Sequence, residues 1–332
     1  MIGQISTTFL KNMIANKRII VTGGSGFIGT NFLDFLITKT NCKVVNFDTA
    51  APRNNDHRFL WREIDINNLE ILEKAIHDFK PHCIFNFAAR TDLHGNHIGE
   101  YQTNILGIKN LIQVVLSMNK EPDIFFFSSM LVNKLGENHI KHDDCHPKTF
   151  YGCSKLLGEK IILESKLKKK IIIRPTSIWG PWFGAPYRNF FDILKRGYFI
   201  SCNKFNVRKT YGYVENSVLQ IIYLYLNKDH LEESIFYLGD SNSYLLEDWL
   251  KDISKLQNIK IFRFPSKLIL LLSLIGSFAS AFRLRPPLTY FRYKNMSTQN
   301  ICPLGSLIKY TGPAKYSRYY GCRKTLSWLE KN

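Results

Sequence analysis

Hydrophobic positions along residues 17–175 recur with two different periods, which predict alternating strands and helices. Short apolar, β-branched runs are typical of buried strands, and apolar residues three and four positions apart are typical of helices. The expected strands cover residues 18–22, 42–47, 57–64, 82–87, 124–128 and 171–173, and the expected helices cover residues 27–38, 69–79, 101–118 and 151–168. Strands that alternate with helices favour a parallel sheet covered on both faces, so we predict an α/β fold with a doubly wound sheet.

The pattern is less regular in the second half of the chain. Residues 179–186 are rich in turn-forming residues, a strand is expected at residues 235–238, and helices are expected at residues 216–226, 245–256 and 325–331. We predict a short N-terminal extension (1–16), a first domain that holds the sheet (17–175) and a smaller mixed lobe (176–332), part of which returns to the first domain. A substrate would bind between the two parts.

The charge balance narrows the class of partner. The 332 residues include 45 Lys and Arg against 27 Asp and Glu, a formal net charge of +18. Such an excess favours anionic partners, namely nucleic acid, a membrane surface or phosphorylated small molecules. The dense run Lys166 and Lys168–Lys170 is interpreted as a solvated helix end, and no nucleic-acid-binding motif is found. We therefore expect a phosphorylated small molecule and no nucleic acid.

The cysteines give no sign of disulfides or of a metal site. The seven cysteines are scattered, none forms a C-x-x-C pair, and no His and Cys cluster has zinc spacing. Residues 1–16 lack a basic start followed by a long apolar run, so they do not resemble a signal peptide. We expect reduced thiols, a cytoplasmic protein and no metal.

Residues 268–282 form an apolar stretch of 15 residues without a charge. As a helix it would span roughly 22 Å, which is short of the roughly 30 Å of a bilayer core. We expect a buried core helix or a dimer contact. Peripheral docking on the inner face of the membrane is the other interpretation.

A glycine-rich turn follows the first expected strand. Residues 22–29 read T-G-G-S-G-F-I-G, so Gly23, Gly26 and Gly29 have G-x-x-G-x-x-G spacing between a strand and a helix. Glycines there let the backbone approach a pyrophosphate, which the helix N-terminus attracts. Asp48 ends the second strand, where a carboxylate can bind a ribose 2′-OH and repel a 2′-phosphate. These features predict a Rossmann-type sheet that binds NAD rather than NADP, with Arg53 nearby leaving the cofactor choice open.

Tyr151 and Lys155 form the candidate catalytic pair. They lie four residues apart at the start of an expected helix, so they point to one face. A lysine ammonium beside a phenol stabilises the phenolate, so we expect the pKa of Tyr151 to be lowered toward neutrality. Ser128 and Ser129 end the preceding strand, where a hydroxyl can bind the same substrate oxygen. The group suits proton transfer coupled to hydride transfer.

With these motifs the chain resembles the extended short-chain dehydrogenases, specifically the NAD-dependent epimerase/dehydratase family that includes UDP-galactose 4-epimerase. The resemblance covers residues 17–330. The matching motifs are T-G-G-S-G-F-I-G (22–29), N-F-A-A (86–89), N-I-L-G-I-K-N-L (104–111), F-S-S (127–129), Y-G-C-S-K (151–155) and R-P-T-S-I-W-G-P (174–181).

The resemblance implies roles for individual residues. Ser129, Tyr151 and Lys155 would be catalytic. The cofactor NAD would be bound by Gly23, Gly26, Phe27, Ile28, Gly29, Asp48, Asp65, Ile66, Phe87, Ala88, Ala89, Asn104, Tyr151, Lys155, Pro175 and Ser177. A nucleotide-diphosphate sugar would be bound by Thr91, Ser129, Asn189, Arg208 and Lys209. The resemblance also implies a homodimer built on the helices at residues 101–118 and 151–168.

Four departures from the family pattern affect the substrate more than the cofactor. Asn133-Lys134 replaces a usual Tyr-Gly, and Ser177 replaces a frequent asparagine. Lys209 stands where an arginine usually holds the diphosphate, and lysine supplies the charge without the bidentate fork. Met130-Leu131 stands where 4,6-dehydratases have Asp-Glu, so dehydratase activity is disfavoured.

Other polar and aromatic residues have ordinary explanations. We interpret His94 and His97 as loop surface, although both could reach sugar hydroxyls. We interpret Trp179, Trp182 and Phe183 as packing of the second lobe rather than as a stacking platform for a base.

Three functions remain open. The first is a nucleotide-sugar epimerase, an isomerase, in surface polysaccharide biosynthesis. The second is an NAD(P)-dependent reductase or dehydrogenase that acts on a keto sugar or on a 3β-hydroxysteroid-like alcohol. The third is a non-catalytic NAD-binding scaffold, which the intact Ser129, Tyr151 and Lys155 disfavour.

Overall fold

The protein contains a seven-stranded parallel sheet, seen here in a computed structural model that describes residues 13–134, 136, 145–184, 187–195, 198–202, 207–281, 286 and 288–331. Its strand order is β11-β6-β5-β4-β1-β2-β3. The strands are β1 (Arg18–Thr22), β2 (Lys43–Asp48), β3 (Trp61–Glu63), β4 (Cys83–Asn86), β5 (Asp123–Phe127), β6 (Lys170–Pro175) and β11 (Ile235–Leu238). The α/β fold and its doubly wound sheet are thus confirmed.

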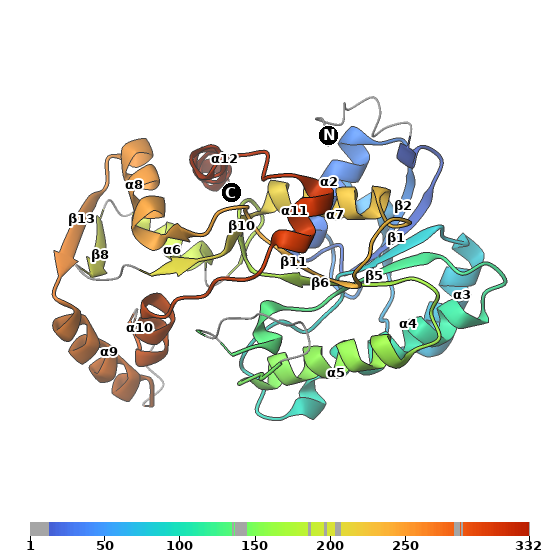
Figure 1. Cartoon of the computed structure of the whole chain (residues 1–332), viewed down its shortest axis with the longest axis horizontal. Coiled ribbons are helices and arrows are strands. Elements are labelled where there is room, and N and C mark those ends of the chain that lie inside the picture. Colours follow the sequence, from blue (N-terminus) through green and yellow to red (C-terminus); the bar gives the residue numbers. More distant parts are fainter. Residues whose placement is uncertain are drawn as a thin grey trace.

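Helices cover both faces of this sheet (Figure 1). One face carries α2 (Phe27–Lys39), α7 (Val214–Leu226) and α11 (Gly305–Thr311), and the other carries α3 (Leu69–Phe79), α4 (Leu106–Ser117) and α5 (Phe150–Glu164). Alternate residues of each strand face the two layers: in β1, Ile19 and Val21 join one core cluster and Ile20 joins the other. This burial on both sides explains why the strands are almost continuously apolar.

The strand order reverses between β1 and β4. The strands after β1 continue to one side as β2 and β3, whereas β4, β5 and β6 continue to the other. At such a switch point the connections leave in opposite directions, which opens a crevice at the carboxyl ends of the strands. The glycine turn after β1, the loop after β4 and the end of β5 all meet at this edge.

Four expected elements differ clearly from the structure. The helix expected at residues 325–331 begins seven residues earlier, because α12 covers Arg318–Lys331. Residues 57–64 are mostly not a strand: Asn55–Leu60 form the 3₁₀ helix η1, because His57 and Leu60, three residues apart, turn to the same buried side. Residues 101–118 are not one helix, since the 3₁₀ helix η2 (Ile98–Asn104) ends at Ile105 before α4 begins. Helix α5 ends at Glu164 rather than at residue 168.

Two residues of the basic run after α5 have structural roles, since Lys169 pairs with Asp229 and Lys170 binds the end of the helix. The Lys170 ammonium donates to the carbonyl oxygens of Leu163 at 2.6 Å and Ser165 at 2.8 Å, which are at the end of α5. A cation there satisfies carbonyl groups that the helix itself leaves without donors. Lys166 and Lys168 are exposed, as expected for a solvated segment.

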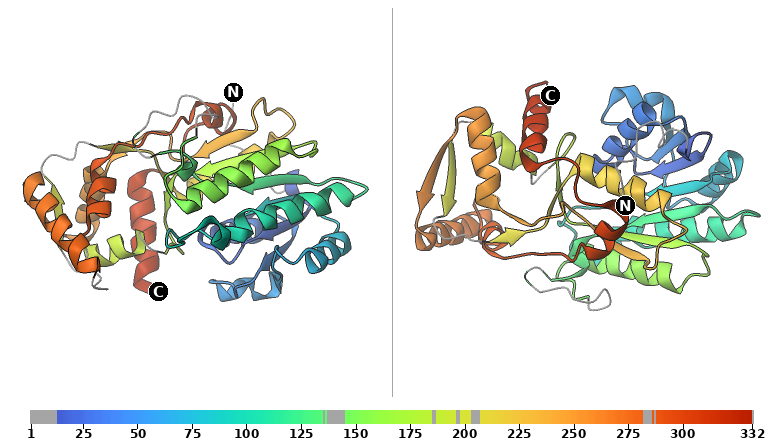
Figure 2. Two further views of the ribbon diagram at one scale, coloured as in Figure 1. Left: turned by 90° about the horizontal axis from the view of Figure 1, so that it is seen from below. Right: turned by 45° about the horizontal axis from the view of Figure 1, so that its top comes forward.

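The remaining elements form the smaller mixed lobe (Figure 2). Its strands pair two by two: β7 (Ser177–Trp179) with β10 (Tyr211–Tyr213), β9 (Arg208–Lys209) with β12 (Tyr244–Leu245), and β8 (Tyr198–Cys202) with β13 (Lys260–Phe264). Its helices are α6 (Tyr187–Lys195), α8 (Leu246–Gln257), α9 (Ser266–Ala281), α10 (Tyr290–Ser297) and α12 (Arg318–Lys331).

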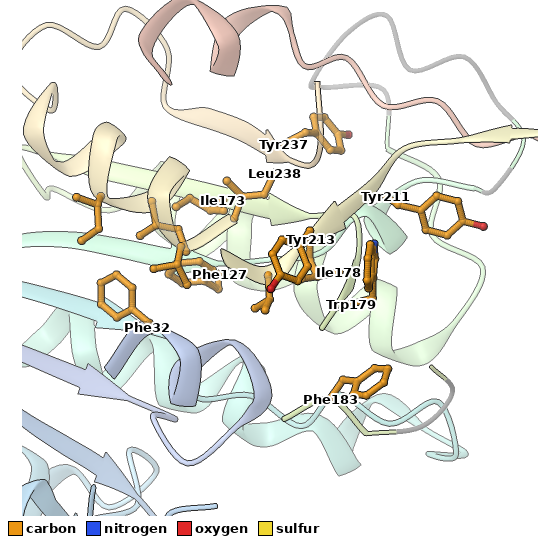
Figure 3. Packing of buried hydrophobic residues seen from close by; sticks show 14 of the residues in the cluster. Phe32, Phe127, Ile173, Ile178, Trp179, Phe183, Tyr211, Tyr213, Tyr237 and Leu238 are labelled. Atoms are coloured by element: carbon orange, nitrogen blue, oxygen red, sulfur yellow. The ribbon is translucent and has the colours of Figure 1, made fainter. Parts of the chain in front are cut away.

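One hydrophobic cluster runs from the sheet into this lobe (Figure 3). Trp179 is fully buried, its ring centroid lies 4.7 Å from that of Trp249, and its indole donates to the Tyr244 hydroxyl at 2.8 Å. Phe183 is also buried in this cluster. The interpretation of Trp179 and Phe183 as packing residues is therefore confirmed, and the shared core holds the two parts of the chain together.

The apolar stretch expected at residues 268–282 forms most of α9, with Phe282 outside the described residues. The prediction of a buried core helix is wrong, because six of its large apolar side chains are at least 40% exposed. Within the described part of the chain, every helix is too short or too polar to span a bilayer.

Candidate active site

The turn after β1 passes so close to the loop after β4 that it requires glycine. Gly23 has a φ of +71°, and a Cβ at this position would lie 2.4 Å from the Ala88 nitrogen. A side chain there would be both strained and in collision with backbone. The glycine therefore draws the loops after β1 and β4 together at the switch point of the sheet.

A second close contact at this turn was not predicted from the sequence. The Gly24 amide donates to the side-chain oxygen of Asn46 at 2.9 Å, and a Cβ on Gly24 would lie 2.4 Å from that oxygen. The Asn46 side-chain amide also donates to the Ser25 hydroxyl at 3.1 Å. An asparagine inside the apolar strand β2 was the available signal, because a fully buried amide requires polar partners.

Helix α2 begins directly after this turn. Gly26 is its N-cap, and no side chain caps the helix start. The first amide groups of a helix have no partner within the helix, and its dipole favours anions there. The start of α2, formed by Phe27, Ile28 and Gly29, therefore offers donors suited to a pyrophosphate.

Asp48 supports the turn from the end of β2. Its carboxylate accepts hydrogen bonds from the Ser25 amide and from the Ala50 amide, both at 2.9 Å. Arg53 donates to the carbonyl oxygens of Ser25 at 3.1 Å and Trp182 at 2.8 Å. Because the Arg53 guanidinium already bonds to backbone, it is a weaker candidate for holding a 2′-phosphate than the sequence alone suggested.

The loop after β4 is held in place by a buried amide. Asn104 is fully buried, and its side chain accepts from the Arg90 amide at 3.0 Å and donates to the Arg90 carbonyl and the Ser154 hydroxyl, both at 2.9 Å. Asn104 thus joins the loop that contains Ala88 and Ala89 to helix α5. Its contribution to cofactor binding would be to hold this loop.

Two further predicted cofactor residues follow β3. Asp65 is exposed, and its carboxylate accepts from the Asn67 amide at 2.9 Å. Ile66 is buried beneath it, and the Asn110 side chain donates to its carbonyl at 2.9 Å. Both residues follow β3, the strand at the edge of the sheet beyond β1 and β2.

The candidate catalytic residues converge at the end of β5. The Lys155 ammonium donates to the Phe127 carbonyl, the last residue of β5, at 2.7 Å. The Ser129 hydroxyl lies near enough to the Tyr151 phenol to oppose the rise in its pKa, and it accepts from the Leu131 amide at 3.1 Å. Phe127 stacks on Phe87 of the β4 loop with ring centroids 3.9 Å apart. The pair on α5 therefore points toward the sheet edge that the glycine turn borders.

Burial controls the protonation of this pair. Burial raises the pKa of Tyr151 to about 12, and the nearby Ser129 hydroxyl opposes that rise only in part. Burial lowers the pKa of Lys155 to about 8, while Glu159 acts in the opposite direction. The prediction of a phenol tuned toward neutrality by Lys155 is wrong for this structure, because the loss of hydration disfavours the phenolate.

A buried ion pair anchors α5 to the sheet. Arg174 of β6 binds Glu159, one turn beyond Lys155, through two hydrogen bonds of 2.6 and 2.9 Å, and both side chains are buried. Arg174 also donates to the Tyr237 hydroxyl at 3.0 Å, which accepts from Asn133 at 2.6 Å. This network was not predicted. It connects the loop after Ser129, helix α5 and strands β6 and β11.

The segment after β6 adds another unpredicted residue. Pro175 ends β6, and Ser177 begins β7 and lies beside the hydroxyl of Tyr187. Burial raises the pKa of Tyr187 to about 12, and the nearby Ser177 hydroxyl opposes the rise. No local sequence pattern links the two residues, which are brought together by the return of α6 over β7.

Four of the predicted substrate residues are more exposed to solvent than the buried catalytic residues. Thr91 and Asn189 are exposed, and Arg208 is exposed while donating to the Ser243 carbonyl at 2.6 Å. Lys209 is half-buried, and burial lowers its pKa to about 8. His94 and His97 are exposed, as expected for loop surface.

Known proteins resemble the chain in sequence. The model of the NAD dependent epimerase/dehydratase family matches residues 19–237. UDP-glucose 4-epimerase of Vibrio cholerae is 23% identical over 72% of this chain and 75% of that enzyme. The 3-beta-hydroxysteroid dehydrogenase of Mycolicibacterium neoaurum is 26% identical over 60% of this chain and 58% of that enzyme, less than two thirds of its length.

The fold is also found in solved structures. The Bordetella bronchiseptica enzyme WbmG, in complex with NAD and UDP, aligns with a TM-score of 0.71 at 17% identity, over 96% of this chain and 95% of that chain. At this identity the similarity establishes a common fold only.

Proposed function

Because the chain belongs to the NAD-dependent epimerase/dehydratase family, whose cofactor is NAD, we propose that it is a nucleotide-sugar epimerase. In this proposal the enzyme oxidises a sugar hydroxyl to a transient ketone and then reduces it from the other face. The reaction would be an isomerisation without net redox change. The arrangement around β1, β4 and β5 supports this proposal.

The residues at the sheet edge fit NAD. The start of α2 offers amide donors for a pyrophosphate, and the cradle between Gly23 and Ala88 leaves no room for a side chain. The Asp48 carboxylate lies at the end of β2, where a ribose hydroxyl would bind. Bound there, NAD would supply a hydride acceptor and donor.

Three side chains of the chain would handle the proton. Tyr151 would remove the proton of the substrate hydroxyl, and Ser129 would hydrogen-bond the same oxygen. Lys155 would hold positive charge next to the forming phenolate, and at 2.7 Å its bond to the Phe127 carbonyl fixes its position. Since burial alone raises the phenol pKa to about 12, Tyr151 needs this cation and the positive nicotinamide ring to ionise.

Basic side chains favour an anionic substrate on the side of the second lobe. Arg208 and Lys209 lie on β9, and Thr91 is exposed on the loop after β4. We propose that these residues and Asn189 bind the diphosphate and sugar of the substrate. Lysine at position 209 would attract the diphosphate without the two-pronged geometry of arginine.

The residues that follow Ser129 are the reason why we propose an epimerase rather than a dehydratase. Met130 and Leu131 follow Ser129 and start the 3₁₀ helix η3 (Met130–Val132). Neither side chain can donate or accept a proton, and elimination of water from the sugar requires an acid and a base beside it. This single observation favours epimerisation.

A coupled assay with UDP-hexoses tests the proposal. We expect inversion at one sugar carbon with no net change in NADH absorbance. Tyr151→Phe should lower kcat by about 10²- to 10⁴-fold, because it removes the acid and base, while NAD still binds. Fluorescence titration with NAD provides the check that the variant remains folded.

Two results would contradict the epimerase. Steady formation or consumption of NADH would instead support a reductase or dehydrogenase of a keto sugar or of a 3β-hydroxysteroid-like alcohol, the second candidate, which the steroid dehydrogenase relative favours. Activity that survives Tyr151→Phe would contradict the catalytic assignment itself. Our proposal further includes a homodimer in the cytoplasm and a role in surface polysaccharide biosynthesis.

A further inference from the structure

Helix α9 (Ser266–Ala281) presents its large apolar side chains to the outside. The exposed fractions are 40% for Leu268, 55% for Leu271, 45% for Leu272, 48% for Leu274, 57% for Ile275 and 70% for Phe278. Leu268, Leu271, Leu272 and Ile275 have the spacing i, i+3, i+4 and i+7, so they form one continuous stripe. Exposed apolar patches of this kind mark interaction surfaces.

The opposite stripe of α9 is the one that packs on the protein. It contains Ile269, Ser273 and Gly276, all buried. A Cβ on Gly276 would lie 1.9 Å from the Leu288 carbonyl oxygen, so the helix touches that segment backbone to backbone. The Ser277 hydroxyl accepts from the Tyr290 amide at 2.7 Å. Apart from Ile269, the buried residues of this stripe are small and most large apolar residues face outward, the reverse of an ordinary surface helix.

The segment of the sequence that includes α9 carries basic and no acidic side chains, and one of its basic residues, Arg263 of β13, pairs with Glu247 of α8. Residues 253–295 contain eight Lys and Arg and no Asp or Glu. Lys260, Lys267 and Lys294 are exposed, on β13, α9 and α10. In both figures that show the whole chain, α9 lies at the end of the molecule farthest from the parallel sheet (Figures 1 and 2). An outward apolar stripe therefore stands among positive charges, away from the candidate active site.

We propose that α9 docks the protein on the surface of an anionic phospholipid membrane. The apolar stripe enters the boundary between head groups and acyl chains, and the surrounding lysines bind the acidic head groups. The charge pattern favours this occupant over a second copy of the chain, because two α9 faces would bring the exposed Lys260, Lys267 and Lys294 of one copy toward the same lysines of the other. The helix lies in the plane of the interface and does not cross it.

Vesicle flotation with the full chain tests this proposal. The wild-type protein should float with vesicles of phosphatidylcholine and phosphatidylglycerol, and much less with phosphatidylcholine alone. The bound fraction should fall as salt rises, because salt screens the lysines. Leu271→Glu/Ile275→Glu should weaken binding by at least about tenfold, because two apolar side chains no longer enter the interface.

A matched variant controls for the added charge. Phe59→Glu/Ile71→Glu replaces two side chains that are 68% and 50% exposed on η1 and α3, and it should bind vesicles as the wild type does. Circular dichroism and thermal unfolding verify that both variants fold.

Three outcomes of the vesicle experiment would overturn the proposal. In the first, the wild-type protein does not float with the anionic vesicles. In the second, the α9 variant and its control bind these vesicles equally. In the third, the wild-type protein binds anionic and neutral vesicles equally. A dimer that dissociates on Leu271→Glu/Ile275→Glu would likewise overturn it, since a second copy would then cover α9.

Discussion

At the scale of single residues, the proposed proton transfer depends on two buried groups whose charged forms are both disfavoured. Tyr151 is driven toward the neutral phenol, with a pKa of about 12, and Lys155 toward the neutral amine, with a pKa of about 8. Near neutral pH the lysine is still mostly charged. It therefore places a positive charge in a buried site of low dielectric constant, where its electrostatic interaction with a phenolate is stronger than in water.

Lys155 should leave a signature in the pH dependence of stability. Its pKa falls from 10.5 to about 8 on folding, so between these pH values the unfolded chain binds the proton more tightly than the folded protein does. The contribution of Lys155 to folding stability is therefore complete above pH 10.5 and is lost as pH falls through about 8. Between these values the free energy of unfolding of the wild type should rise relative to that of Lys155→Met by up to about 3 kcal/mol. Urea denaturation across this pH range measures the difference.

Lys160→Met is the control for that experiment, because it removes an exposed ammonium from the same helix. A wild type that gains nothing over Lys155→Met between neutral and alkaline pH would show that burial does not depress the pKa of Lys155.

The two adjacent serines should differ sharply in catalysis. The Ser129 hydroxyl lies beside the Tyr151 phenol and accepts from the Leu131 amide, whereas the Ser128 hydroxyl is buried without a hydrogen-bond partner in the described part of the chain. Ser129→Ala should lower kcat by roughly 10- to 10³-fold, because the substrate oxygen loses a donor. Ser128→Ala should lower kcat far less and leave stability nearly unchanged. Equal losses in steady-state kinetics would disprove this distinction.

At the scale of elements, helix α5 is attached to the sheet by polar bonds at several points along its length. Thr149 caps its N-terminus by accepting from the Gly152 amide at 3.0 Å, Lys155 bonds to β5, and Glu159 bonds to Arg174 of β6. Lys170 then binds carbonyls at its C-terminal end. These bonds fix the position of α5, and with it Tyr151, relative to the carboxyl ends of the strands.

Breaking the Glu159–Arg174 pair should destabilise the fold strongly. Glu159→Leu leaves the buried guanidinium without its carboxylate, which should cost about 3–5 kcal/mol of unfolding free energy. Glu159→Leu/Arg174→Met should recover much of that loss, because no unpaired charge remains. Urea denaturation of both variants gives the values.

The half-exposed pair Arg188–Asp192 on α6 provides the comparison. Asp192→Ala should cost at most about 1 kcal/mol, because solvent screens a half-exposed pair. If the cost of Glu159→Leu were as small as that of Asp192→Ala, the anchoring role of the buried pair would be excluded.

At the scale of the whole molecule, two adjacent helices leave leucines on the surface. Leu106 and Leu116 of α4 and Leu157 and Leu163 of α5 are 39–43% exposed. Figure 1 shows these helices side by side on one face of the sheet. A two-fold axis through such a face buries the same patch of both subunits. The surface supports the proposed homodimer on α4 and α5.

Leu116→Glu/Leu163→Glu should convert this dimer into monomers, because it buries four carboxylates in the interface. Sedimentation velocity measures the state of assembly. Leu271→Glu/Ile275→Glu, on the distant α9, should leave the dimer intact. A monomeric wild type, or a variant that remains dimeric, would refute the assignment of this interface.

The sequence by itself determined the features that depend on neighbours along the chain. The bounds of β1, α3 and β11 agree with the hydrophobic pattern at both ends, because their period and breakers are local. The glycine turn and the spacing of Tyr151 and Lys155 were likewise readable, since a strand-to-helix turn and one helical turn are short-range geometry.

Only the tertiary structure decided what those residues meet across space. Asn46 meets Gly24, Arg174 meets Glu159 and Tyr187 meets Ser177 through contacts that join separate elements. The burial that raises the pKa of Tyr151 and the outward direction of the apolar side of α9 also result from the packing of separate elements. Burial and pKa depend on the packing of distant segments, and the local sequence of a segment does not contain that information.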